Sequence, residues 1–120
     1  MSESPLIAVV DDDAAVREAI QSLIRSVGLR VKVFASAEEF LHSGHLQDTA
    51  CLIVDVRMPR MNGLELQRQL ATAHRPIPTV FITAHGDEET RGCALRVGAV
   101  AFLDKPVSDE VLLGAVRSAL

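Results

Sequence analysis

Short apolar runs alternate with segments of helical character along the whole chain, and this alternation limits the possible folds more than any other feature. The runs at residues 6–10, 51–54, 79–83 and 100–103 have the length of buried strands and are too short for helices. Residues 30–34 alternate polar and apolar side chains, which is typical of a strand at a sheet edge. Five strands alternating with five helices predict an α/β fold. In such a fold, right-handed crossovers connect the strands of a parallel sheet, and helices cover both of its faces.

The expected helices have recognisable start and stop signals. The first is expected between Asp13, a suitable N-cap, and Gly28, a suitable stop. Ser36 and Glu39 form a capping box, which predicts a short second helix. The remaining three helices are expected to end before Pro76, at Gly98 and at the end of the chain.

The composition limits the compartment and the kinds of partner. A chain of 120 residues with a net charge of −4 has the length of one domain and no general attraction for nucleic acid or anionic membranes. No apolar run approaches the ~20 residues of a membrane helix, and no signal peptide opens the chain. Cys51 and Cys93 lack metal-type spacing and are expected to be small buried residues of a reducing compartment. These features predict one cytoplasmic domain over residues 1–120.

Four of the five expected strands end in polar residues, which are Asp11 and Asp12, Asp55, Thr83 and Lys105. The carboxyl ends of parallel strands share one edge of the sheet, and ligands of open α/β sheets bind there. Clustered carboxylates repel one another unless a cation joins them, and oxygen ligands suit Mg²⁺. Thr83 and Lys105 add a hydrogen-bond donor and a positive charge. This set of groups is typical of phosphoryl transfer, in which a carboxylate can be the nucleophile.

The sequence resembles the receiver domain of response regulators in two-component signalling, and the resemblance covers residues 6–120. The motifs that carry it are Asp11-Asp12, Asp55-x-x-Met58-Pro59-x-Met61-x-Gly63, Thr83-Ala84 and Lys105-Pro106. Residues 81–87 and 98–106 are most similar to the FixJ-type branch. The resemblance implies a flavodoxin-like (βα)5 fold, doubly wound, with five parallel strands in the order 2-1-3-4-5.

The resemblance also implies a role for each acidic residue. Asp55 would be the phosphoacceptor, taking a phosphoryl group from a phosphohistidine of a sensor histidine kinase. Mg²⁺ (or Mn²⁺) would be bound by Asp12, Asp55 and the backbone carbonyl of Arg57, with Asp11 acting through a water molecule. The domain would assist its own phosphorylation and dephosphorylation, and it would not be an enzyme that converts an external substrate.

Three further residues would make the site a switch. Thr83 and Lys105 would hold the phosphoryl oxygens, and the aromatic side chain of Phe102 would turn inward as Thr83 moves. Phe102 stands where the family commonly has tyrosine. The resemblance implies a cis peptide bond between Lys105 and Pro106. His85 lies two residues beyond Thr83, at a position that affects the rate of phosphoryl hydrolysis in the family.

The resemblance also suggests partners. Phosphorylation would change the surface formed by the helix at residues 88–97, the strand at 100–103 and the final helix, and a homodimer could form there. Proteins of this branch usually carry a C-terminal DNA-binding output domain, so DNA would be contacted only through a domain outside residues 1–120.

Two other functions fit part of the pattern. A phosphatase of the haloacid-dehalogenase type would use Asp11 and Asp13 as its D-x-D motif. This function would leave Asp55 without a role, and the sequence has no acidic motif after Lys105 to complete the metal site of such an enzyme. A flavin-binding module would share the fold class, but the carboxylates after the first strand would repel a flavin phosphate. Substitutions distinguish a receiver from a phosphatase. Asp55→Asn should abolish phosphorylation of a receiver, whereas Asp11→Asn should abolish phosphorylation of the phosphatase.

Overall fold

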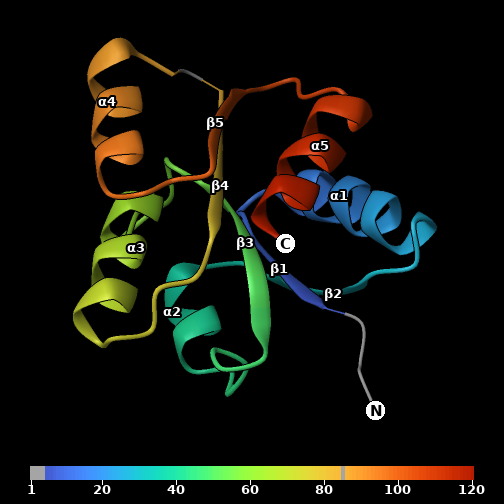
Figure 1. The fold of residues 1–120 in the computed structure, drawn as a ribbon, viewed down its shortest axis with the longest axis horizontal. Helices are drawn as coiled ribbons and strands as arrows, with labels where there is room; N and C mark the ends of the chain where they lie inside the picture. Colours follow the sequence, from blue (N-terminus) through green and yellow to red (C-terminus); the bar gives the residue numbers. More distant parts are fainter. Residues whose placement is uncertain (1–4, 85) are drawn as a thin grey trace.

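The computed structural model describes residues 5–84 and 86–120, and within them five strands and five helices alternate along the chain (Figure 1). In chain order these are β1 Leu6–Val10, α1 Ala14–Ser26, β2 Arg30–Phe34, α2 Ala37–Leu41, β3 Thr49–Asp55, α3 Gly63–Thr72, β4 Thr79–Thr83, α4 Glu88–Arg96, β5 Ala101–Asp104 and α5 Asp109–Ala119. The strands form one sheet in the order β2-β1-β3-β4-β5, and every neighbouring pair is parallel. The predicted fold and strand order are confirmed, and β2 is the edge strand that its alternating pattern indicated.

Helices cover both faces of the sheet, with α1 and α5 on one face and α2, α3 and α4 on the other (Figure 1). Successive residues of a strand point to opposite faces. Val9 therefore packs in the same apolar cluster as Ile24 of α1, whereas Val10 packs in the same cluster as Phe40 of α2. Because both faces are covered, the inner strands need apolar residues at nearly every position, which explains their continuous apolar runs.

Two strands differ from their expected limits. β3 begins at Thr49 and includes Asp55, because Thr49 pairs with Leu6 across an irregular register between β1 and β3. β5 covers residues 101–104 in place of 100–103, because its ladder with β4 begins where Ala101 pairs with Val80. Asp55 is thus the last residue of the strand in the middle of the sheet, where it pairs with Ile82 of β4.

Local hydrogen bonds define where the helices begin. The Asp13 side chain accepts a hydrogen bond from the backbone N–H of Ala15 at 2.9 Å, as its expected N-cap role requires. The start of α3 has a capping box that was not predicted from the sequence, in which Asn62 and Glu65 each accept a hydrogen bond from the other's backbone N–H at 2.9 Å. This box anchors the loop that follows Asp55.

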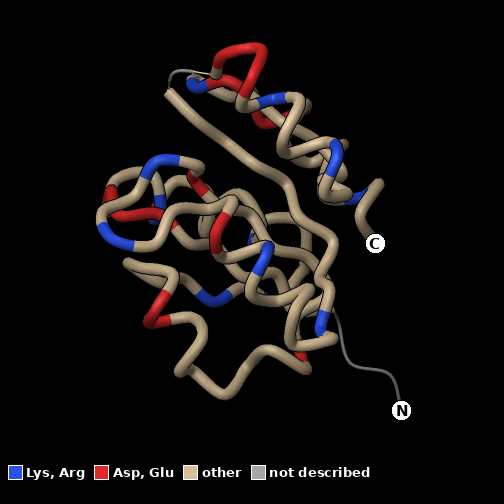
Figure 2. The backbone as a smooth tube through the Cα atoms, turned by 90° about the vertical axis from the view of Figure 1, so that its left-hand side faces the viewer, with Lys and Arg blue, Asp and Glu red and all other residues tan. Residues whose placement is uncertain are grey.

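The surface charges are mixed. Acidic and basic residues are interspersed along the chain and are not separated by sign (Figure 2). Among the residues that the structure describes, no helix is long and apolar enough to cross a membrane.

The two cysteines differ in exposure, which corrects the expectation that both are buried. Cys51 in β3 is fully buried, and burial raises the pKa of its thiol to about 12. Cys93 in α4 is only partly buried, because it lies on a helix that covers the sheet and is not part of the sheet itself.

We therefore predict that a thiol reagent such as 5,5′-dithiobis(2-nitrobenzoate) modifies one cysteine of the native protein at pH 8 and both in denaturant. The thiolate is the reactive form, and Cys51 remains protonated and inaccessible in the native fold. Mass mapping should place the rapid reaction at Cys93, and Cys93→Ser should abolish it. Rapid modification of Cys51 in the native protein would contradict the prediction.

Candidate functional site

The structure brings the polar strand ends together at the carboxyl edge of the sheet. Asp11 follows β1, Asp55 ends β3, Thr83 ends β4 and Lys105 follows β5. The parallel register determines this convergence, since Asp55 pairs with Ile82 while Thr83 pairs with Asp104. Residues from opposite ends of the sequence thus form one cluster.

Three carboxylates form the acidic part of this cluster. Asp11, Asp12 and Asp55 each offer an oxygen atom, and these atoms lie within 4.8 Å of one another. Asp11 and Asp55 are buried, whereas Asp12 is exposed, so the cluster faces solvent on one side only. A donor set made only of oxygen atoms, open to water on one side, fits Mg²⁺, which keeps several waters and takes few protein carboxylates. These residues could therefore hold Mg²⁺.

Backbone groups orient the two buried carboxylates. Asp11 Oδ1 accepts a hydrogen bond from the N–H of Asp13 at 2.9 Å, and Asp55 Oδ1 accepts one from the N–H of Arg57 at 3.0 Å. In each carboxylate the Oδ2 atom points to the same partner, which is the ammonium group of Lys105.

Lys105 bridges the two buried carboxylates. Its Nζ lies 3.1 Å from Asp11 Oδ2 and 3.0 Å from Asp55 Oδ2. Burial opposes the charge of Lys105, but the hydrogen bonds with Asp55 and Asp11 outweigh it and raise the pKa of the ammonium group. Lys105 therefore places one positive charge between the two buried carboxylates. The peptide bond that follows it, between Lys105 and Pro106, is cis.

Burial disfavours the charged form of Asp11 as well, but for a carboxyl group this means a higher pKa. It raises the pKa of this carboxyl, although the hydrogen bonds from Asp13 and Lys105 favour the charged form. The charged form of Asp11 thus depends on the hydrogen bonds that it accepts from the Asp13 N–H and from Lys105.

Comparison with known proteins identifies the family. A family model described as the response regulator receiver domain matches residues 7–117. The chain belongs to this family.

The relatives of this receiver domain are longer proteins. The response regulator protein TmoT of Ectopseudomonas mendocina is 50% identical over 118 residues, which cover 98% of this chain and 54% of TmoT. The transcriptional regulatory protein FixJ of Azorhizobium caulinodans is 41% identical over 120 residues, which cover 100% of this chain and 57% of FixJ. The receiver domain thus spans about half the length of these relatives.

Solved structures agree with this assignment. The response regulator StyR has a TM-score of 0.91 and 44% identity, and the match covers 98% of this chain and 60% of StyR. FixJ-N has a TM-score of 0.86 and 36% identity, with 99% and 94% covered. The resemblance to the FixJ-type branch is confirmed, and the comparisons give no support to the phosphatase alternative.

The other expected switch residues of the receiver domain also lie near this edge. Thr83 is buried at the end of β4, and its carbonyl accepts a hydrogen bond from the N–H of Lys105 at 2.7 Å. Phe102 is buried in β5, and its ring lies 6.4 Å from that of Phe81. His85 lies outside the residues that the structure describes.

Three residues near the receiver site were not identified from the sequence. Arg17 Nη1 donates to the backbone carbonyl of Asp11 at 2.7 Å, and Arg91 of α4 reaches the backbone carbonyl of Phe102 at 3.2 Å. Gly86 lies against Phe102. Nothing in the sequence distinguishes these arginines from the other eight, because their contacts join separate elements.

Gly63 is required by the close approach of α3 to Asp55. A Cβ atom at this position would lie 2.7 Å from the backbone carbonyl oxygen of Asp55 and 3.1 Å from the Phe81 ring. We predict that Gly63→Ala destabilises the protein by about 1–3 kcal/mol, since the strand end or the helix must move. Urea unfolding measures this change.

Gly114 in α5 provides the matched control for Gly63. A Cβ atom at Gly114 would meet nothing within 4 Å, so Gly114→Ala should stabilise the protein by roughly 0.5–1 kcal/mol through helix propensity. If the two substitutions changed the free energy of unfolding equally, the close contact at Gly63 would not be the reason that the position requires glycine.

Proposed function

We propose that the chain is a phosphorylation-operated signalling switch with Asp55 as the phosphoacceptor. The observation that carries this proposal is the position of Asp55, whose carboxylate lies 3.0 Å from the ammonium of Lys105 in an oxygen cluster at the carboxyl edge of a receiver domain. The side chain is 9% exposed, so one oxygen can meet a donor while competing water is limited.

Asp12, Asp55 and the backbone carbonyl of Arg57 would hold Mg²⁺ (or Mn²⁺), and Asp11 would act through a bound water. The metal would supply positive charge that offsets the negative charge of the phosphoryl oxygens and of the carboxylates. The N–H of Arg57 already donates to Asp55 Oδ1, which leaves Asp55 Oδ2 as the atom that faces the cation of Lys105.

The transfer would proceed by in-line attack. An oxygen of Asp55 would form a bond to phosphorus as the bond between phosphorus and the imidazole nitrogen of a phosphohistidine breaks. Lys105 would exchange a carboxylate partner for a phosphoryl oxygen, and the hydroxyl of Thr83 would donate to another. This chemistry changes the chain itself, so the domain would assist its own phosphorylation and dephosphorylation without converting an external substrate.

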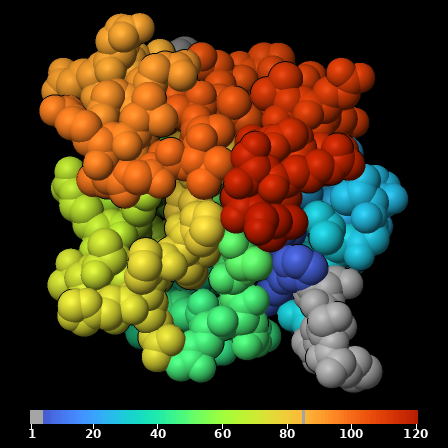
Figure 3. Space-filling model, viewed as in Figure 1, coloured from blue at the N-terminus to red at the C-terminus, as the bar shows by residue number. Residues whose placement is uncertain are grey.

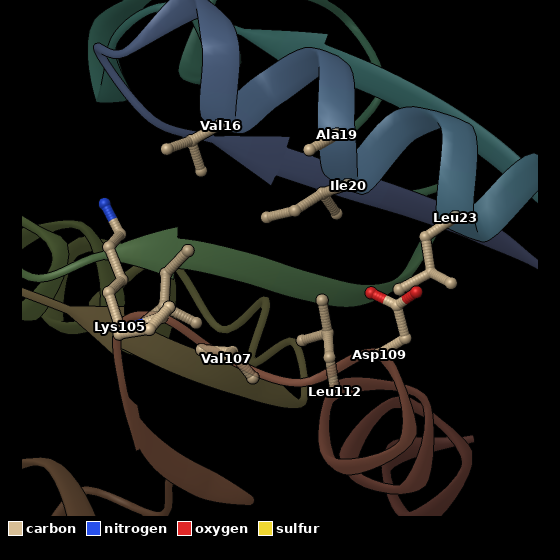
Figure 4. A pocket seen from close by; sticks show the side chains of 10 residues that line it. Val16, Ala19, Ile20, Leu23, Lys105, Val107, Asp109 and Leu112 are labelled. Carbon is tan, nitrogen blue, oxygen red and sulfur yellow. The ribbon is translucent and has the colours of Figure 1, made fainter.

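A sensor histidine kinase would be the phosphodonor. An apolar groove of about 420 Å³ between α1 and α5 adjoins Lys105 and is lined by Val16, Ala19, Ile20, Leu23, Val107 and Leu112, among others (Figure 4). A helix that carries the phosphohistidine could place its apolar face in this groove and its imidazole over Asp55.

The output would appear on the surface of α4, β5 and α5. Movement of Thr83 and Phe102 would alter these elements, which lie side by side on one face of the molecule (Figure 3). Leu95 of α4 and Val111 of α5 are exposed, and apolar side chains of this kind could form a homodimer interface. In a longer protein with a C-terminal DNA-binding domain, dimerisation would control binding to DNA, and the whole protein would act in the cytoplasm.

Intact mass spectrometry after incubation with acetyl phosphate tests this function. The wild-type protein should gain one phosphoryl group in the presence of Mg²⁺, and chelation of Mg²⁺ with EDTA before the reaction should prevent the gain. The adduct should disappear with time and with hydroxylamine, which cleaves acyl phosphates. An adduct that forms equally well in EDTA would contradict the proposed site.

A further inference from the structure

One guanidinium group connects α4 with β5 at the aromatic residue of the switch. Arg91 Nη1 donates to the carbonyl oxygen of Phe102 at 3.2 Å, and Arg91 Cζ lies 5.0 Å from the centre of the Phe102 ring. Arg91 Nη2 also lies 3.5 Å from Oδ2 of Asp104. Arg91 therefore contacts the backbone and the ring of Phe102 together with the side chain two residues further along β5.

The other contacts of Phe102 leave little room for its ring. The ring of Phe81 lies 6.4 Å away, and a Cβ atom at Gly86 would lie 2.7 Å from Phe102 Cε1. Phe102 is only 4% exposed although β5 is an edge strand. The ring thus occupies a narrow site that Arg91 covers.

We propose that Arg91 is a positioning residue that holds the Phe102 ring in its buried position and couples α4 to the switch. Arginine suits this role because its planar guanidinium can stack on a ring and donate hydrogen bonds at the same time. The guanidinium contacts the buried ring, so removing it takes away a contact that favours the buried position. Because Arg91 belongs to α4, a change in the position of Phe102 would alter a direct contact between that residue and the helix.

The contribution of the ion pair with Asp104 is small, because both side chains are largely exposed and water screens their charges. The contact with the ring carries the effect. For a partly exposed cation–π pair, its loss corresponds to a change of roughly two- to fivefold in the ratio of buried to exposed ring.

Fluorine NMR of the protein labelled with 4-fluorophenylalanine tests this role. The chain has four phenylalanines, and Phe102→Leu identifies the resonance of Phe102. The solvent isotope shift between H₂O and D₂O measures exposure of the ring. Arg91→Gln should increase the exposed population of Phe102 roughly two- to fivefold, and Arg91→Lys, which keeps the charge but loses the planar group, should lie between Arg91→Gln and the wild type.

Arg96 provides the matched control on the same helix. Its guanidinium contacts Gly92 and Cys93 of α4 in the hydrogen bonds that the structure describes, so Arg96→Gln should leave the Phe102 resonance unchanged. Gly86→Ala supplies the reference for a displaced ring, since its Cβ would collide with Phe102 and Asp104. An Arg91→Gln protein with the wild-type isotope shift would overturn the proposal, as would an equal change in Arg96→Gln.

The inferred link to α4 rests on the proposed function, but the two can fail separately. The NMR comparison is made on unphosphorylated protein and does not depend on Asp55. Failure of Asp55 to accept a phosphoryl group would overturn the switch, whereas an unchanged Phe102 resonance in Arg91→Gln would overturn only the role of Arg91.

Discussion

Asp55→Asn should reduce phosphoryl uptake from acetyl phosphate to the detection limit of intact mass spectrometry. The substitution replaces an anionic oxygen with an amide nitrogen whose lone pair is delocalised, so the nucleophile is lost. The fold should persist, because the remaining amide oxygen can still accept the hydrogen bond from Arg57 N–H and Lys105 keeps its contact with Asp11. We expect the free energy of unfolding to change by about 1 kcal/mol or less.

Asp13→Asn is the matched control for this experiment. Asp13 lies two residues from Asp11 and caps α1, and asparagine is an equally good N-cap. Asp13→Asn should therefore take up a phosphoryl group as the wild type does. If an adduct persists in Asp55→Asn, the phosphoacceptor is another residue, and peptide mapping after reduction with borohydride would locate it.

Lys105→Met should have the largest effect on stability. It removes the cation from two buried carboxylates and leaves Asp11, which has no exposed surface, without its charged partner. Breaking a buried pair of this kind costs roughly 3–5 kcal/mol, and the partial exposure of Lys105 reduces the expected loss to about 2–4 kcal/mol at pH 7. Urea unfolding at constant ionic strength measures the loss.

The effect of Lys105→Met should depend on pH with a definite sign. The pKa of Asp11 is raised in the native protein, and removing the ammonium raises it further. A raised carboxyl pKa favours the folded state at low pH, where the group is neutral, and this stability is lost as the pH rises through the folded-state pKa. The difference between Lys105→Met and the wild type should therefore be smaller at pH 4 than at pH 7.

Two controls make the Lys105 result specific. Lys32→Met changes the only other lysine, which is exposed on the edge strand β2, and should alter stability by less than about 0.5 kcal/mol. In the double variant Asp11→Asn/Lys105→Met, the amide carries no charge that needs a cation, so much of the lost stability should return. A loss that is independent of pH and unchanged by Asp11→Asn would show that packing of the lysine side chain is responsible.

Mg²⁺ should compensate partly for the missing ammonium group. In the wild type a metal ion would compete with Lys105 for Asp55, whereas in Lys105→Met the carboxylates have no internal cation. Saturating Mg²⁺ should thus increase the stability of Lys105→Met more than that of the wild type. Equal stabilisation would show that Lys105 and the metal do not compete.

The sequence by itself determined the architecture. The inner strands are apolar at nearly every position and β2 alternates, and these patterns predicted the parallel sheet and its edge strand, because burial on two faces and on one face impose different residue choices. Asp13 and Ser36 marked the starts of two helices through hydrogen bonds within four residues. The positions of Asp55, Thr83 and Lys105 at or just after the ends of their strands were sufficient to predict that they meet, since parallel strands share a carboxyl edge.

Only the tertiary structure decided how these residues are used. It buries Asp11 and leaves its neighbour Asp12 exposed, and it sets Lys105 between Asp11 and Asp55. It also places Arg91 on the ring of Phe102 and leaves Cys93 only partly buried. The physical reason is the separation along the sequence of the residues that interact. Helix caps and strand patterns depend on neighbours in the chain, whereas burial and ion pairing depend on side chains contributed by separate elements.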